Sequence, residues 1–157
     1  MNDVPHYLES HIPPEYTLVC DGGWAMCLGE KGIITADLIM ELPDDSIREL
    51  CGGIASNAVP ADAYALVAPV APRMLEKLRE EYPDVAFDRR EEGVVIRTYG
   101  KAAHAFVPHT GKNAIYRLLD VLCDYPGISS ATSQKVLWMK ECFVDDYGTG
   151  LDIAYED

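Results

Sequence analysis

The chain has 157 residues, 48% of them hydrophobic and 25% charged, so it is long enough to bury a core as one domain without disulfides or metal. Its formal net charge of −13 argues against nucleic acid as a partner, because phosphate binding needs basic patches, and against anionic membranes. No apolar run has the length of a transmembrane helix, and the N-terminus lacks the apolar core of a signal peptide.

The cysteines are odd in number, widely scattered and without a Cys-x-x-Cys pair, and most lie in apolar runs. They are Cys20, Cys27, Cys51, Cys123 and Cys142. This pattern predicts a reduced, cytoplasmic protein with buried thiols. A cysteine hydrolase that uses Cys51 or Cys123 with His104 is a weaker hypothesis, because no histidine adjoins a cysteine in the sequence.

The first third of the chain predicts few regular elements. Residues 1–15 show no clear period, and we interpret them as a lead-in that is disordered or rests on the domain surface. Residues 17–20 predict a short strand, and Asp21 after them is, on the residues alone, a turn residue. Residues 33–42 are rich in apolar and β-branched side chains and predict the first long strand of the main sheet.

A capping box and a glycine pair come next. Ser46 with Glu49 three residues later predicts one or two helical turns, which Gly52-Gly53 would stop. Asn57 follows in a stretch that ends at Pro60, and on the residues alone it caps or turns the backbone before the next strand.

The middle of the chain alternates strands with one helix, which Pro72 begins and Pro83 ends. The predicted strands cover residues 63–68, 85–87 and 94–99, with a charged hairpin loop over residues 88–93.

A loop with His104 follows the last strand, and small residues on either side leave the imidazole free to point out of the fold. Thr110 or Asn113 would cap the helix after it, whose apolar stripe ends near residue 124. A further helix is predicted over residues 130–143. This order of elements predicts an α+β fold in which helices pack on one face of an antiparallel sheet. A lone histidine in such a place more often packs at a strand end.

The run Gly100-Lys101-Ala102-Ala103-His104, with the proline, glycine and Asn-Ala that follow it, resembles the lid-domain signature of the dinuclear zinc metallopeptidases, a family of dipeptidases, carnosinases and aminoacylases. A second stretch, Gly52-Gly53 followed by Asn57 and Val59-Pro60, is similar to that family too. The resemblance is closest to bacterial dipeptidases. It implies a ferredoxin-like lid and dimerisation domain over residues 29–157, after a remnant of the catalytic domain over residues 1–28.

The resemblance also implies roles for three residues. His104 would stabilise the tetrahedral oxyanion, and Asn57 would hold the bound substrate from the lid side. Asp21 would be a zinc ligand, because it lies nine residues before Glu30, as a metal-binding aspartate does in the dipeptidase branch. The parent enzyme would use two zinc ions, act on a dipeptide or an N-acyl amino acid, and form a homodimer through the lid.

Much of the family's metal chemistry is absent from this sequence. It has no His-x-Asp motif, no histidine after His109, and Glu-Glu pairs only on a polar helix end and in a charged loop. One carboxylate does not hold zinc against water. We therefore expect a lid-containing fragment or an excised domain, truncated at its C-terminal end, inactive alone and holding no zinc. The alternative is a non-catalytic ferredoxin-like dimerisation or ligand-binding module, which explains the missing ligands without truncation.

Overall fold

The computed structural model describes residues 3–16, 35, 37 and 39–154. The chain divides into two compact units, residues 1–36 and 37–157. The first unit contains the short helix α1 (Asp3–Leu8). The ring of Tyr7 in this helix stacks on the ring of His11, with centroids 4.3 Å apart. The lead-in therefore contains a helix that the absence of a period did not indicate. The strand and turn predicted over residues 17–23 lie outside the described residues.

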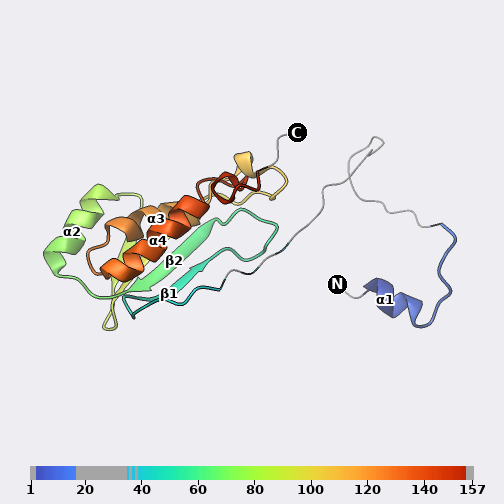
Figure 1. The fold of residues 1–157 in the computed structure, drawn as a ribbon, viewed down its shortest axis with the longest axis horizontal. Coiled ribbons are helices and arrows are strands. Elements are labelled where there is room, and N and C mark those ends of the chain that lie inside the picture. The colour runs from blue at the N-terminus through green and yellow to red at the C-terminus, as the bar shows by residue number, and fades with distance from the viewer. Residues whose placement is uncertain (1–2, 17–34, 36, 38, 155–157) are drawn as a thin grey trace. The chain divides into compact units, whose positions relative to one another are not determined.

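The second unit is built on a four-stranded antiparallel sheet with the strand order β1-β2-β4-β3. Figure 1 labels the neighbouring strands β1 and β2. The strands are β1 (Ile47–Gly52), β2 (Asp62–Val67), β3 (Ala86–Arg89) and β4 (Val94–Tyr99). Because β2 and β3 are both antiparallel to β4, they run parallel to each other with β4 between them. Helix α2 (Pro72–Glu81) connects these two parallel strands.

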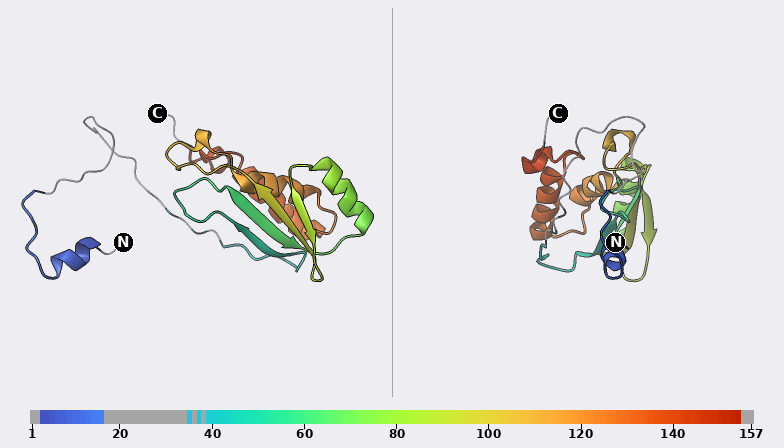
Figure 2. Two further views of the ribbon diagram at one scale, coloured as in Figure 1. Left: turned by 180° about the vertical axis from the view of Figure 1, so that it is seen from behind. Right: turned by 90° about the vertical axis from the view of Figure 1, so that its right-hand side faces the viewer.

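Helices α3 (Ala114–Asp124) and α4 (Ser130–Cys142) cover one face of the sheet (Figure 2). Two short 3-10 helices, η1 (Pro108–Thr110) and η2 (Thr149–Leu151), lie before α3 and after α4. The predicted α+β fold, an antiparallel sheet with helices packed on one face, is confirmed. In the described part of the chain, no helix is long and apolar enough to cross a membrane.

Strand alternation decides which side chains lie under the helices. The most deeply buried residues are every second one of two neighbouring strands: Ala63, Ala65 and Val67 of β2, and Val94, Ile96 and Thr98 of β4. They pack with Leu118, Leu119 and Leu122 of α3. Each fully buried side chain of leucine size stabilises the fold by about 1.5–3 kcal/mol relative to exposure. The hydroxyl of Thr98 donates to the carbonyl oxygen of Ala114 at 2.7 Å, so its burial leaves a satisfied polar group.

The helical turns predicted from Ser46 and Glu49 are wrong, because this segment forms strand β1. The pairing with β2 is irregular between Ile47 and Glu49, where one extra residue is inserted as a β-bulge. The bulge lets Ile47 and Leu50 both reach the core, although a spacing of three would place them on opposite faces of a regular strand. That spacing of apolar residues imitates a helix.

The long strand predicted over residues 33–42 is not present in the part of it that is described. Thr35, Asp37 and residues 39–42 have no regular secondary structure, and the other positions lie outside the described residues. Ile39 is 95% exposed, so its β-branched side chain lacks the packing partner from which β-propensity mostly arises.

The other elements agree with the prediction to within two residues at either end, the usual uncertainty of element boundaries. Strand β3 continues to Arg89, into the stretch predicted as loop. The cap of α3 is Asn113, whose side-chain oxygen accepts from the N–H of Ile115 at 3.0 Å, while Thr110 lies in η1.

Candidate functional site

Two loops meet at one end of the sheet. Residues 53–61 join β1 to β2, and residues 100–113 join β4 to α3. Because β2 and β4 are antiparallel neighbours, the start of β2 and the end of β4 lie at the same end. The first loop contains Asn57 and the second contains His104.

Backbone hydrogen bonds continue the pairing of β2 and β4 into these loops. The N–H groups of Gly100, Val59 and Ala105 donate to the carbonyl oxygens of Ala61 (2.8 Å), Ala103 (2.8 Å) and Asn57 (2.9 Å), respectively. An isolated antiparallel bridge also joins Ala58 to His104. The structure therefore brings the backbones of Asn57 and His104 together, although they are far apart in the sequence.

The base of the His104 loop is closed on itself. Lys101 and Lys112 exchange two backbone hydrogen bonds, of 2.8 and 2.9 Å. A Cβ atom added to Gly100 would come within 2.0 Å of the carbonyl oxygen of Lys112, so only glycine permits this close approach. Gly100 therefore allows the close approach, and Lys101 makes the backbone hydrogen bonds that close the base of the loop.

The side chain of His104 is exposed, and its orientation is held by its own loop. The backbone N–H of Phe106 donates to Nδ1 of His104 at 3.1 Å. A backbone N–H cannot accept, so Nδ1 carries no proton in this arrangement and the neutral imidazole has its proton on Nε2. The His104 ring thus offers a hydrogen-bond donor, Nε2–H, to a group outside the loop.

Asn57 lies in a turn, as its residue type predicts. The N–H of Ala58 donates to the carbonyl oxygen of Ala55 at 3.3 Å and closes this turn. The carbonyl oxygen of Asn57 is used by Ala105, and its side chain is exposed. A contact of the Asn57 amide with a substrate remains a prediction.

The zinc ligand implied by the resemblance cannot be placed beside these loops, because Asp21 and Glu30 lie outside the described residues. Within residues 3–16, 35, 37 and 39–154, no group of three or more His, Cys, Asp and Glu side chains could hold a metal ion. The described residues therefore do not fit a zinc centre.

Among the described cysteines, Cys51 departs from the expectation of buried thiols. Cys142 is buried and Cys123 is partly buried, but Cys51 is exposed on β1, because it lies on the helix-free face of an edge strand. Burial raises the pKa of the Cys123 thiol, which makes it a poorer nucleophile at neutral pH. The hypothesis of a cysteine hydrolase gains no support from this burial.

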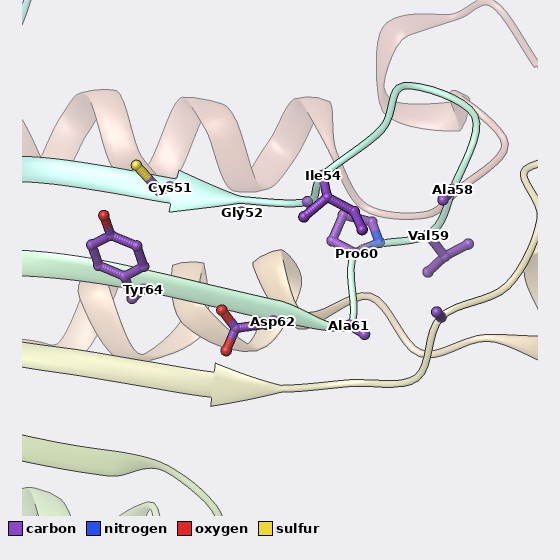
Figure 3. Close-up of a pocket in the computed structure, with 11 residues that line it drawn as sticks. Cys51, Gly52, Ile54, Ala58, Val59, Pro60, Ala61, Asp62 and Tyr64 are labelled. Atoms are coloured by element: carbon purple, nitrogen blue, oxygen red, sulfur yellow. The ribbon is translucent and has the colours of Figure 1, made fainter.

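A hollow of about 370 Å³ lies next to the paired loops (Figure 3). The end of β1, the loop before β2 and the start of β2 form most of its lining. Ala58 and Ala102 belong to the lining, whereas their neighbours Asn57 and His104 do not. The hollow is therefore adjacent to the candidate residues and separate from them.

The tail after α4 supports the start of α3, which the sequence did not indicate. Asp146 accepts hydrogen bonds from the side-chain amide of Asn113 at 2.8 Å and from the hydroxyl of Tyr116 at 2.6 Å. Its carboxylate thereby holds the residue that caps α3 and ends the His104 loop. No spacing in the sequence connects Asp146 to Asn113.

Neither protein-family models nor curated proteins give a match to this chain. A function for it has to be argued from its own residues and their geometry.

Proposed function

We propose that this chain contains the lid and dimerisation domain of a zinc-dependent dipeptidase or related amidohydrolase, in which His104 stabilises the oxyanion. The pairing of the two loops supports the proposal most directly. The side chains with which a lid contacts its substrate have to lie close together. The backbone hydrogen bonds between the two loops bring Asn57 and His104 to the same end of the sheet.

The hydrogen bonding of His104 supports its proposed role. When a peptide carbonyl is attacked, negative charge develops on its oxygen, and an oriented donor stabilises that charge. The Phe106 N–H holds Nδ1, so Nε2–H is free to make that contact without a change of tautomer. The exposed amide of Asn57 has both a donor and an acceptor for the substrate backbone.

Two zinc ions are part of the proposed parent enzyme, where they would polarise the carbonyl and activate water. The described residues form no zinc site, and Asp21 is the candidate ligand among those outside them. The donor role of His104 does not depend on how the metal is held. The substrate class is a dipeptide or an N-acyl amino acid.

We also propose a ferredoxin-like connectivity, a homodimer through the lid, and a cytoplasmic location. The crossover from β2 through α2 to β3, with β4 between the parallel strands, supports the first of these. Strand β2 has β4 on one side and β1 on the other, and β1 precedes β2 in the chain.

The gene provides the first test of the proposed family. We expect the coding sequence upstream of this segment to contain a His-x-Asp motif and a Glu-Glu pair in a glycine-rich loop. A complete gene that encodes neither motif would contradict the peptidase proposal. It would favour the second candidate, a non-catalytic ligand-binding module, for which the hollow beside the loops is the specific observation.

A further inference from the structure

The hollow beside the loops opens on the face of the sheet that the helices do not cover (Figure 3). Asp62 and Tyr64 of β2 line it, and they alternate with Ala63 and Ala65, which are fully buried in the core with α3. Alternation therefore directs Asp62 and Tyr64 away from the helices. The volume of the hollow, about 370 Å³, lies in the range of small-ligand sites.

Most of the lining is apolar. Ile54, Val59 and Pro60 come from the loop, and Gly52-Gly53 contribute backbone. The carboxylate of Asp62 and the hydroxyl-bearing ring of Tyr64 are its main polar groups. Such a lining favours an apolar ligand that carries one positive charge, because the carboxylate attracts a cation and repels an anion.

One cation is already attracted to these two groups. The guanidinium carbon of Arg97 lies 5.4 Å from the centroid of the Tyr64 ring, and an Arg97 nitrogen lies 3.5 Å from Oδ2 of Asp62. Both side chains of this ion pair are exposed by about half, 42% and 50%, and the contact is long, so solvent screens it and a second cation can compete. The other carboxylate oxygen, Oδ1, is outside the Arg97 contact.

The surrounding charge favours a cation as well. The negative charge of Glu49 on β1 interacts electrostatically with Tyr64. The molecule as a whole carries a net charge of −13, which also attracts cations. A hydrogen bond that the Tyr64 hydroxyl donates to Cys51, together with the charge of Glu49, raises the pKa of Tyr64, so its ring is neutral at physiological pH. A neutral aromatic face attracts ammonium groups.

We propose that this hollow binds a small organic ammonium ion with an apolar body, the body lying against Ile54 and Pro60 and the charge between Asp62 and Tyr64. Nothing in the proposed peptidase function requires such a site, and the two proposals fail independently.

Three probes of the same shape test the charge preference. We expect 2-phenylethylamine to cause saturable shifts in the backbone NMR signals of Gly53, Asp62 and Tyr64 in the full chain. The neutral 2-phenylethanol should bind about two- to fivefold more weakly, the loss of one exposed ion pair, and phenylacetate more weakly still. No zinc is added, so the result does not depend on the peptidase proposal.

Variants locate the binding groups. Asp62→Asn should weaken the amine by about two- to fivefold and leave the alcohol unchanged. Tyr64→Leu should weaken the amine by a similar factor through the lost cation–π contact. Asp88→Asn is the matched control, because Asp88 pairs with Val95 on the same sheet but does not line the hollow. It should leave amine binding unchanged, and unaltered melting temperatures check that each variant is folded.

Three results would each overturn the proposal. The first is equal binding of the amine and phenylacetate, and the second is signal changes that do not saturate with the amine. The third is an Asp62→Asn variant that binds the amine as tightly as the unchanged chain.

Discussion

At the scale of single residues, the function proposed for His104 depends on which ring nitrogen carries the proton. The sequence identifies the histidine and the small residues around it, because they match a recognisable pattern. It does not show the bond from the Phe106 N–H to Nδ1, which depends on how the loop turns back on itself. The tautomer is therefore a structural result.

Nitrogen NMR tests this tautomer. In the full chain at a pH where His104 is neutral, we expect the Nε2–H form, with Nδ1 in the unprotonated shift range. The exposed His109 provides a comparison in the same spectrum. A dominant Nδ1–H form of His104 would remove the basis for its role as a donor through Nε2.

At the scale of elements, the N-terminus of α4 is joined to the segment before β1. The hydroxyl of Ser129 caps α4 by accepting from the N–H of Thr132 at 3.1 Å, and it donates to Asp44. Asp44 also accepts from the N–H of Ser46 at 2.9 Å. The hydrogen bond from Ser129 is the main cause that lowers the pKa of Asp44 to about 2.

This arrangement predicts a stability that depends on pH. A carboxyl group whose pKa is about 2 in the folded state and about 3.9 in the unfolded state stabilises the fold above pH 4. That contribution is lost as the pH falls from about 4 to about 2. Urea unfolding of Asp44→Asn should show a smaller loss of stability over this interval than the unchanged chain. The exposed neighbour Asp45 supplies the control, and an Asp45→Asn variant with the same effect would contradict the assignment.

The elements also show where sequence patterns are sufficient. Pro72, the alternation of β2 and β4, and Asn113 before α3 are local signals, and the structure confirms the elements that they predict. The β1 segment was predicted wrongly because the spacing of Ser46 and Glu49 is a local signal, whereas the bulge and the strand are set by the pairing with β2, a tertiary contact.

The candidate site was predictable to a similar extent. Its two loops contain recognisable residues, but their pairing and the hollow beside them arise from the order of strands in the sheet. The support from Asp146 depends on the tail folding back to α3, for which the sequence has no periodic signal.

At the scale of the whole molecule, apolar side chains remain exposed on α4. Trp138 is 45% exposed and lines a shallow groove with Ile39 and Met40. Large exposed apolar surfaces are typical of interaction sites. We expect the chain to self-associate or to bind a hydrophobic dye, and Trp138→Arg to reduce either effect.

Sedimentation velocity and dye fluorescence measure this property. Tyr147→Arg is the control, because Tyr147 is also exposed but lies outside the groove. A clean monomer that binds no dye would contradict the expectation.

Zinc affinity is a second property of the whole chain. Because the described residues form no metal-binding group, we expect the 157-residue chain to retain no stoichiometric zinc after dialysis against a weak chelator. Elemental analysis gives the answer. One or more zinc ions retained per chain would show that residues outside the described ranges complete a site.

The kinetics of His104→Ala in the complete enzyme test the proposed function most directly. An oxyanion donor acts mainly in the transition state, so turnover should fall by about two to three orders of magnitude while KM changes little. The melting temperature should be nearly unchanged, because the His104 side chain is exposed. Ile96→Val, at a fully buried position, is the contrasting control and should cost about 0.5–1.5 kcal/mol of stability with little loss of turnover. Near-normal turnover of His104→Ala with a clearly lowered melting temperature would show that His104 is structural and would contradict its role as an oxyanion donor.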